Sequence, residues 1–528
     1  MAATTSNPVG LETPTAQAGA SKWVIAIAVA LGALLEVIDS SIVNVGLTDM
    51  QASLGATVTQ ISWVVSSYAI ANVIILPLSA WLGHRFGKKR YFVFSLLGFT
   101  AASVMCGLST TLMMLTISRV LQGLFGGGLL AKAQTILFET FPREEQAAAQ
   151  GFFGAIVIAG PVIGPTLGGY LVTNVGWRWM FFINLPVGIG AVMMCQFALP
   201  ADGALPKKQP IDWTSIALLA IGIGAFQIFL EEGYSEDWFD SPLIVGCAIA
   251  ALFGLALFVV RQLESDHPVV DLRVLRYRSL AAGSVLSIVV GIALYGALFA
   301  LPLFASSVLH YTAQEVGLML FPGAIASAVS MPIASKLVKK YDPRILLAIG
   351  GAILGCAVVW LGMLTPTTSA GDLFWPLLVR SFGSILMFLP LSMAALGTIP
   401  KKDVAAATSF YNLTRQLGGS IGVAILSTLL GTRNAFHRGV LVEKLAVTDP
   451  DVQARLQSLA QAMVAKGADV VTAKQRAYAM LDGQTMLQAS VLSFNDMFIV
   501  TSILIFASIP LAFILRRPGA GVTVDAGH

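Results

Sequence analysis

The feature that most constrains the fold is a series of apolar runs, each about 20 residues long and separated by short polar breaks. A helical run of that length matches the roughly 30 Å hydrocarbon core of a bilayer. Because lipid offers no partner for free backbone groups, such runs form helices rather than open sheets. The composition agrees, with 56% hydrophobic and only 11% charged residues. The sequence therefore predicts an all-α integral membrane protein.

Fourteen transmembrane helices are predicted, beginning near residues 23, 60, 91, 112, 148, 179, 213, 242, 280, 315, 344, 372, 403 and 494. The segments assigned to the inside hold 20 Lys and Arg, whereas the short outside loops hold one, Arg178. Positive residues gather on the cytoplasmic side of membrane proteins. Both termini are therefore expected in the cytoplasm. The first 21 residues have no basic region ahead of an apolar core, so no cleaved signal peptide is expected.

Two basic segments of equal length indicate an internal repeat. "AWLGHRFGKKR" (80–90) follows the second span, and "ASKLVKKYDPR" (334–344) follows the tenth. Two six-helix bundles with two helices inserted between them produce that spacing, and parallel repeats are a known transporter architecture. The predicted domains are a disordered cytoplasmic tail (1–22), an N-terminal six-helix bundle (23–200), two inserted transmembrane helices (201–262), a C-terminal six-helix bundle (263–516) and a second cytoplasmic tail (517–528).

The long outside connection, about 431–493, is expected to contain a surface helix rather than another span. Asp449 precedes Pro450 as a helix start, and Gly467 marks the end. One face of this helix carries an apolar stripe, formed by Val452, Leu456, Leu459 and Met463. Either a solvated cap or a surface that packs on the protein or on a partner fits this pattern.

Two acids in the first span, Glu36 and Asp39, stand out because charges are costly in lipid. Their spacing of three residues places them on one helical face. Asp39 is expected about 13 Å from the outer end of its helix, Glu36 about 18 Å, and Arg119 of the fourth span about 10 Å below the same surface. Asp39 and Arg119 are thus predicted partners. Two ionised acids on one face repel, so one of them can keep a proton near neutral pH. A static Asp39–Arg119 pair and a purely lining Glu36 are the alternatives.

Three further basic residues lie within predicted spans. Lys132 sits on the cytoplasmic side of its helix, where a lysine can extend its amine to water. Arg380 and Arg415 either bind anionic groups of a substrate or pair inside the bundle. The four cysteines lie singly in different apolar runs and indicate packing rather than a metal site or a disulfide.

The fifth span contains "GAIVIAGPVIGPTLGGYL" (154–171). Its glycines recur every four residues and offer a flat stripe where another helix can approach closely. Pro161 and Pro165 remove backbone donors, so distortion of this helix is expected there. The stripe and prolines together indicate a conformational role for Gly160, Pro161, Gly164, Pro165, Gly168 and Gly169.

These motifs resemble the major facilitator superfamily, and in particular its 14-helix drug:proton antiporter branch of the EmrB/QacA type. The resemblance spans about residues 23–516 and rests on "IDSSIVNV" (38–45), "WVVSSYAIANVIILPLSAWL" (63–82), "RVLQGLFGGG" (119–128), "GPVIGPTLGG" (160–169), "WRWMFFINLPVG" (177–188), "DWTSIALLAIG" (212–222) and "YNLTRQLGGSIGVAIL" (411–426). It implies a major facilitator fold of two six-helix bundles plus two inserted helices.

The resemblance also implies roles for individual residues. Asp39 occupies the position of the family's helix-1 acid, and Arg119 and Gln122 take a role in proton coupling. The "GPVIGPTLGG" motif implies exchange rather than uptake. In the cytoplasmic loop motif, Ala80 and His84 replace the usual glycine and aspartate, while the basic part is retained by Arg85, Gly87, Lys88 and Lys89.

The function expected from the sequence is proton-coupled efflux of amphiphilic or hydrophobic compounds by alternating access in a bacterial cytoplasmic (inner) membrane. No "GxxxxGK[ST]" phosphate loop is present, so a proton gradient, with no cofactor, is the expected energy source. Glu36 joins Asp39 and Arg119 in the expected proton-coupling group. Residues expected to bind substrate are Gln122, Trp63, Tyr68, Tyr295, Phe388 and Arg415.

Other functions remain open at this point. The closest alternative is an uptake or metabolite-export permease of the same fold with a narrow substrate range. A membrane-embedded enzyme or sensor would need a catalytic cluster or an output domain, and neither is visible. Expected partners are protons, small amphiphiles and lipid, with a periplasmic adaptor and an outer-membrane channel as candidates and no nucleic acid.

Overall fold

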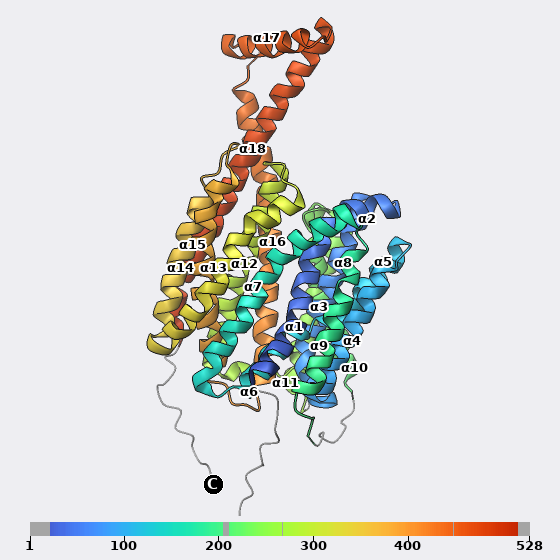
Figure 1. Cartoon of the computed structure of the whole chain (residues 1–528), viewed down its shortest axis with the longest axis vertical. Helices are drawn as coiled ribbons and strands as arrows, with labels where there is room; N and C mark the ends of the chain where they lie inside the picture. The colour runs from blue at the N-terminus through green and yellow to red at the C-terminus, as the bar shows by residue number, and fades with distance from the viewer. Residues whose placement is uncertain (1–21, 204–210, 267, 447, 516–528) are drawn as a thin grey trace, which may run out of the picture.

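The computed structural model describes residues 22–203, 211–266, 268–446 and 448–515 (Figure 1). Apart from Lys22, the two predicted tails lie outside these residues. All regular structure within them is helical, which confirms the predicted fold class.

The N-terminal half is defined here as α1–α9. Its helices are α1 (Lys22–Ile42), η1 (Val43–Gly46), α2 (Leu47–Leu54), α3 (Val58–Phe86), α4 (Lys88–Gly107), α5 (Leu112–Gly126), α6 (Leu129–Thr140), α7 (Arg143–Asn174), α8 (Trp179–Phe182) and α9 (Asn184–Ala198). The inserted segment contains α10 (Trp213–Glu232), η2 (Trp238–Asp240) and α11 (Pro242–Glu264).

The C-terminal half follows the short helix η3 (Leu272–Arg276). It consists of α12 (Arg278–Ser307), α13 (Ala313–Lys340), α14 (Pro343–Leu361), α15 (Ala370–Leu396), α16 (Val404–Glu443), α17 (Pro450–Ala465), α18 (Val470–Ser508) and η4 (Pro510–Ile514). The bounds agree with the predicted order of spans.

Thirteen helical segments of the described chain are long and apolar enough to cross a membrane. The remaining predicted span corresponds to α12, a helix of 30 residues whose apolar stretch Arg278–Ile292 is counted separately. The side chains of residues 293–298 in this helix are not described. Fourteen helical positions therefore match the fourteen predicted ones.

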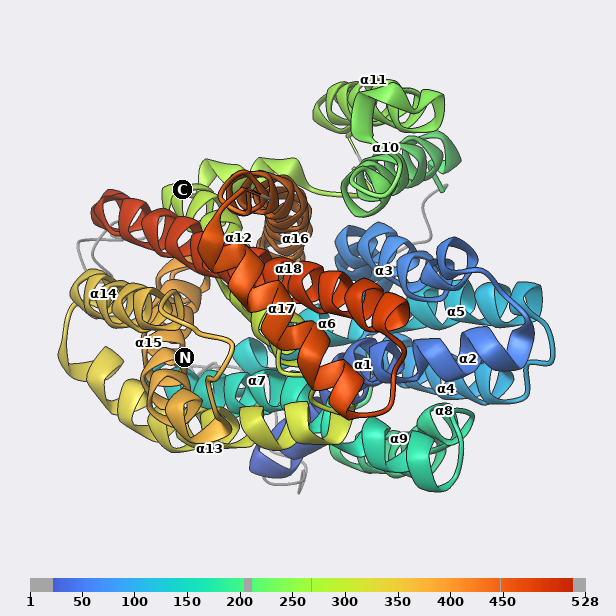
Figure 2. The same cartoon turned by 90° about the horizontal axis from the view of Figure 1, so that it is seen from above.

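The two halves pack side by side, with the inserted pair at the periphery (Figure 2). Helix α7 of the N-terminal half lies along α13 of the C-terminal half, and α3 and α6 both contact α16. Of the inserted pair, α10 packs against both α3 and α16, whereas α11 packs mainly on α10. Helix α10 therefore contacts both halves at once.

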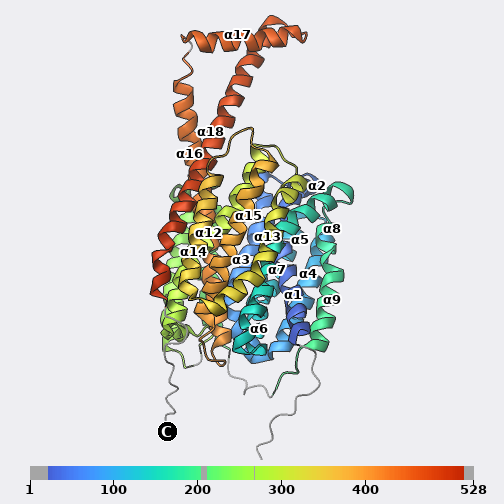
Figure 3. The same ribbon diagram turned by 60° about the vertical axis from the view of Figure 1, so that its left-hand side comes forward.

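The predicted outside loop 431–493 is wrong in its boundaries. Helix α16 continues without a break to Glu443, and α18 begins at Val470 instead of near 494. With 40 residues, α16 is about 60 Å long, roughly twice the bilayer core. Both helices project beyond the bundle, and α17 lies across their ends (Figure 3). The predicted surface helix is confirmed: Asp449 caps α17, and Leu456 of the apolar stripe is buried.

The fourth span is broken into α5 and α6 by Gly126, Gly127 and Gly128. These glycines allow close approach to α3, since a Cβ on Gly127 would collide with the backbone carbonyl of Asn72. The break leaves the first N–H groups of α6 without helical partners inside the membrane region, and such groups require acceptors.

Candidate functional site

The carboxylate of Asp39 lies at the centre of a buried polar cluster. Its Oδ2 atom is 2.5 Å from Arg119 Nη1, and the two side chains are 0% and 1% exposed. Its Oδ1 atom accepts hydrogen bonds from Gln122 Nε2 at 2.7 Å and from Asn184 Nδ2 at 2.9 Å. Helices α1, α5 and α9 thus each contribute to the cluster. The ion pair expected from helical depth is present.

Arg119 is fixed by several further contacts. Its Nε donates to the carbonyl of Val64 at 2.9 Å, and Nη1 also donates to Gln122 Oε1 at 2.7 Å. The guanidinium lies 4.1 Å from the ring centroid of Tyr68. A cation over an aromatic face is attracted by the ring quadrupole. Tyr68, expected to bind substrate, is therefore placed against Arg119.

The described contacts of the Asp39 carboxylate all come from hydrogen-bond donors. A guanidinium and two amides donate to the carboxylate, and charge-assisted bonds of this kind are the strong ones. Adding a proton to Asp39 would leave Arg119 buried without its counter-charge, which is costly in a low-dielectric interior. Proton binding at Asp39 therefore requires Arg119 to gain water or another partner.

Glu36 has a different environment one turn earlier on α1. Its Oε2 atom accepts the backbone N–H of Leu130 at 3.0 Å, and Oε1 accepts from Asn72 Nδ2 at 2.9 Å. Leu130 is the second residue of α6, so the carboxylate satisfies a free donor at the break in the fourth span. The partial positive charge of a helix N-terminus also stabilises an anion there. No cation forms an ion pair with Glu36 within the described chain.

Asn72 connects this acid to the other half of the molecule. Its Oδ1 atom accepts a hydrogen bond of 3.0 Å from Gln416 Nε2 on α16. Glu36, Asn72 and Gln416 thus form a continuous chain from α1 through α3 to the C-terminal half. Glu36 is therefore bonded to the same amide that joins the two halves.

Other polar contacts join the halves toward the end of the bundle from which the described termini emerge. They are Gln134 with Asn412 (2.7 Å), Gln134 with Ser392 (3.1 Å), Ser79 with Ser409 (2.9 Å), and Ser335 with the carbonyl of Ala147 (3.0 Å). On that side, Ala147, Ser335, Ser392 and Ser409 lie within five residues of the ends of their helices, whereas Ser79, Gln134 and Asn412 lie deeper. In this conformation, the halves are held together at mid-depth and on the terminal side.

The glycine stripe of α7 faces α1. A Cβ on Gly160 would meet Val37, one on Gly164 would meet Ser41, and one on Gly168 would meet Ile42. Pro161 and Pro165 lie within α7, which continues to Asn174 as a helix of 32 residues. Helix α1 is therefore packed between the stripe on one side and the Asp39 cluster on the other.

The residues of the cytoplasmic loop motif make their contacts within the N-terminal half. Gly87 has φ of 93°, a value that favours glycine, and it turns the chain into α4. Lys88 pairs with Glu139 at 2.7 Å, and Arg85 lies 5.5 Å from the ring of Trp81. Lys89 Nζ donates to the carbonyl of Leu199 at 2.9 Å, at the end of α9.

Asp202, in the loop after α9, supplies an acid to the cytoplasmic loop motif, in which His84 replaces the usual aspartate. Asp202 accepts the backbone N–H groups of Lys89 at 2.9 Å and Arg90 at 3.0 Å, and so caps α4. A cavity of about 560 Å³ lies here, lined in part by Gly83, Lys88 and Asp202.

The remaining predicted residues are more dispersed. Lys132 is 2% exposed and lies 5.5 Å from the ring of Tyr91, so its amine does not extend to water. Arg415 donates to Asn412 at 2.6 Å and lies 5.1 Å from the ring of Phe388. Arg380 is 8% exposed, and its Nε atom is buried without a partner.

Trp63 is half-buried on α3 and forms no described hydrogen bond with the Asp39 cluster. The side chain of Tyr295 lies outside the described residues. The expected aromatic wall is thus divided: Tyr68 belongs to the Arg119 site, and Phe388 belongs to the Arg415 region.

Amides of Asn and Gln are the functional candidates that sequence reasoning missed. Asn72, Gln134, Asn184, Asn412 and Gln416 are buried or partly buried within apolar spans and carry the hydrogen bonds between helices. An amide inside a membrane span was the available signal, because polar groups in lipid need partners.

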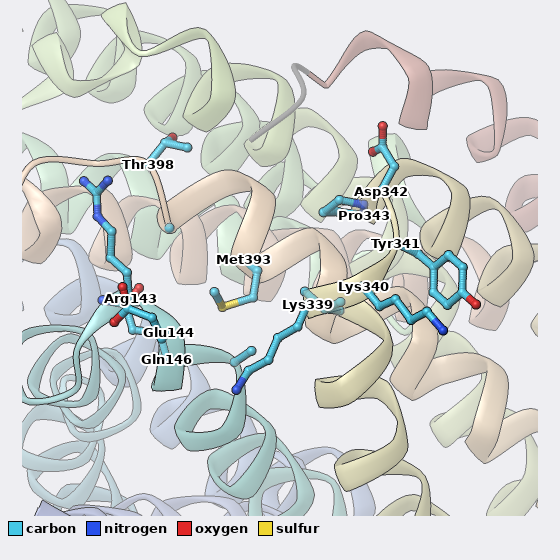
Figure 4. A pocket seen from close by; sticks show the side chains of 13 residues that line it. Arg143, Glu144, Gln146, Lys339, Lys340, Tyr341, Asp342, Pro343, Met393 and Thr398 are labelled. Atoms are coloured by element: carbon cyan, nitrogen blue, oxygen red, sulfur yellow. The ribbon is translucent and has the colours of Figure 1, made fainter. Parts of the chain in front are cut away.

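A cavity of about 730 Å³ opens between the halves at their terminal side (Figure 4). Its lining includes Arg143, Glu144, Lys339, Lys340 and Met393. This cavity lies on the terminal side of the contacts between the halves, where a vestibule would lie. None of the described residues expected to bind substrate lines it.

Comparisons with known proteins agree with this architecture. The family model of the Major Facilitator Superfamily matches residues 29–423. The chain is 32% identical over 512 residues to the multidrug export protein EmrB of Escherichia coli K12, covering 97% of this chain and 98% of that protein. It is 29% identical to the fatty acid resistance protein FarB of Neisseria gonorrhoeae, covering 96% and 98% of the two chains. The structure of the human organic anion transporter MFSD10 aligns with a TM-score of 0.54 and 14% identity, over 92% of this chain and 100% of that chain.

Proposed function

The chain belongs to the Major Facilitator Superfamily, and from this premise we propose that it exports amphiphilic or hydrophobic compounds in exchange for protons. Membership of the family makes it a secondary transporter rather than an enzyme. The names of its relatives, which include multidrug export proteins and a fatty acid resistance protein, support export of small amphiphiles.

The observation that carries the proton-coupled part is the pair of buried acids on one face of α1. Asp39 is bonded to a guanidinium, whereas Glu36 is bonded only to the neutral donors of Asn72 and Leu130. Protonation of Glu36 therefore breaks no ion pair. Binding and release of a proton therefore cost less free energy at Glu36 than at Asp39. Asp39 and Arg119 respond to the change in charge at Glu36.

The proposed cycle begins from the conformation described above, in which the halves meet at mid-depth and on the terminal side. With both termini in the cytoplasm, this is an outward-facing arrangement. A proton from outside neutralises Glu36 and weakens its hold on the N-terminus of α6 and on Asn72. The Asn72–Gln416 contact then loosens, and the halves rock to expose the site to the cytoplasm. Substrate enters there, and release of the proton restores the contacts.

The energy available is sufficient for concentrative export. One proton crossing about 150 mV yields about 3.5 kcal/mol. Because each 1.4 kcal/mol corresponds to about tenfold, this supports roughly several-hundredfold accumulation before any pH difference is added. No hydrolysis of a nucleotide is required.

Transport in everted membrane vesicles tests the proposal. Vesicles acidified by respiration should lose part of their internal acidity when a substrate is added, because exported substrate exchanges with protons. An uptake permease of the same fold would not release protons in this direction. Silence across a broad panel of amphiphilic dyes, in vesicles that contain the protein, would overturn the proposal.

The proposed location is the cytoplasmic membrane of a bacterium. The projecting ends of α16 and α18, together with α17, form a helical hairpin that offers a docking surface for a periplasmic adaptor linked to an outer-membrane channel. Many apolar side chains on this projection are exposed, including Phe436, Val440, Val442, Val470 and Val471. Exposed apolar groups of this kind are typical of interaction surfaces.

A further inference from the structure

A second pair of acids lies on the inserted helix α10, far in sequence from Asp39; Glu232 is buried and Glu231 is half-buried. Glu231 and Glu232 occupy the last turn of this helix, whose C-cap is Gly233. A helix C-terminus carries partial negative charge and disfavours carboxylates, and two adjacent acids also repel each other. Nothing in helix stability explains this placement.

Glu232 is bonded directly to the N-terminal half, whereas Glu231 is linked to the C-terminal half through Gln227 of its own helix. Glu232, 6% exposed, accepts from Ser66 Oγ of α3 at 2.9 Å. Glu231 accepts from Gln227 Nε2 at 2.6 Å, and the same Nε2 donates to Ser420 Oγ of α16 at 2.8 Å. The site thus joins α10 to the N-terminal half through Ser66 and to the C-terminal half through Ser420.

Two oxygen atoms in this site lack a donor. Glu231 Oε2 and Gln227 Oε1 are both buried without a hydrogen-bond partner, and Gln227 is only 1% exposed. Both atoms are acceptors when the acid is ionised. Buried acceptors are almost always paired, and leaving them unpaired is costly. A proton on Glu231 Oε2 would turn one of these two acceptors into a donor.

Nearby charged groups do not explain how these oxygens are stabilised. The facing side chain from α3 is Ser66 and that from α16 is Ser420, both uncharged. On α10 itself the neighbour is the carboxylate of Glu232. In the part of the chain that the structure describes, no Lys, Arg or His forms an ion pair with either acid.

We propose that Glu231 is a second proton-binding site, in which its carboxylic acid and Gln227 form a clasp between the inserted helix and the C-terminal half. A proton from the outside converts the Glu231 carboxylate to the acid, and its release returns the proton to water. Loss of the proton leaves Glu231 Oε2 and Gln227 Oε1 both without a donor and rearranges Gln227, which loosens its bond to Ser420. The coupling to transport rests on the proposed proton exchange, whereas proton binding itself does not.

Infrared difference spectroscopy of the purified, lipid-reconstituted protein across a pH titration tests the binding step. Wild type should show carbonyl bands of carboxylic acids that disappear as pH rises, including one from the proposed proton site Glu36. Glu231→Gln, which keeps the shape but cannot ionise, should lack one of these bands, and Asp237→Asn should retain all of them. Asp237 is a matched control because it is exposed and has φ of 55°, a conformation that Asn tolerates. Glu231→Asp, which retains a carboxyl group, serves if the Gln variant does not insert, and should move the midpoint of the titration.

Counting protons per substrate in proteoliposomes tests the coupling. The ratio should fall by one in Glu231→Gln and stay unchanged in Asp237→Asn. Retention of every wild-type band in Glu231→Gln, or displacement of the missing band by Na⁺ rather than by rising pH, would overturn the assignment. If wild type moves no protons at all, the proposed function fails, while the infrared result still decides whether Glu231 binds a proton.

Discussion

The Oε2 atom of Glu36 accepts the backbone N–H of Leu130 at 3.0 Å, so an acid on α1 caps a helix that begins in the middle of the fourth span. The same carboxylate accepts from Asn72, whose amide oxygen is bonded to Gln416 of the other half. Local helix geometry and contact between the halves are therefore linked through one ionisable group. Through these bonds, the buried acid connects the start of α6 to a contact between the two halves.

Glu36→Gln is expected to flatten the pH dependence of transport while substrate binding is retained. The amide keeps one acceptor oxygen for its donors but cannot exchange a proton. Transport rates measured across a pH series, with Asp49→Asn on the exposed face of α2 as control, check this. An unchanged pH profile would mean that Glu36 only caps α6.

Asp39→Asn is expected to abolish proton-coupled transport and also to destabilise the protein. The change leaves the Arg119 guanidinium buried without a counter-charge, and breaking a buried pair in this way costs about 3–5 kcal/mol. The double variant Asp39→Asn with Arg119→Gln should recover much of this stability but none of the coupling. Thermal unfolding and vesicle transport, measured on wild type and on both variants, separate the two effects. Wild-type coupling in Asp39→Asn would refute the assignment.

Gly164→Ala is expected to impair transport by forcing α1 away from α7. A Cβ at this position meets Ser41 Oγ, with Ser41 Cβ at 2.9 Å and the backbone nitrogen of Ile42 at 3.0 Å. Overpacking of this kind costs about 1–3 kcal/mol. Adding Ser41→Ala removes the nearest atom and should restore part of the activity. Gly190→Ala on α9, where nothing lies within 4 Å, is the control and should be silent.

Asp212 should contribute stability that depends on its charge. The Arg261 guanidinium lowers the pKa of Asp212 from 3.8 to about 2, and the carboxylate also caps α10 through Ser215. Because the folded-state pKa is depressed, the contribution is fully present above pH 4 and is lost as pH falls toward 2. Asp212→Asn keeps a capping oxygen and loses only the ion pair, which is largely exposed and therefore weak.

Asp212→Ala also removes the cap and should cost about 1 kcal/mol more than Asp212→Asn. Denaturant unfolding at neutral pH, followed by tryptophan fluorescence, measures the difference. Equal stability of the Asn and Ala variants would show that the cap contributes nothing.

Replacing residues 446–468 with a short flexible linker should separate transport from resistance. The substitution removes α17 but leaves α16 and α18. Vesicle transport should persist, because Asp39, Glu36 and their partners are untouched. Resistance of whole cells to the same compound should fall if the projection docks an adaptor. Full resistance after the replacement would exclude this role for α17.

The sequence by itself determined the membrane class, the order of the helices and the ion pair between Asp39 and Arg119. Apolar run lengths and helical rise are local properties, so they fix which residues reach the same depth. The sequence also revealed the glycine stripe of α7, although it did not identify α1 as the helix that packs against this stripe.

Only the tertiary structure decided what Glu36 binds, where α16 and α18 end, and which acids on α10 matter. One partner of Glu36 is a backbone N–H. Every residue except proline carries this group, so the residue types in the sequence cannot identify the partner. Asn72, Gln416 and Ser420 lie on helices distant in sequence, and their positions depend on how the halves pack. The extension of α16 beyond the bilayer likewise depends on helices that support one another, since residues 431–443 carry no continuous apolar run.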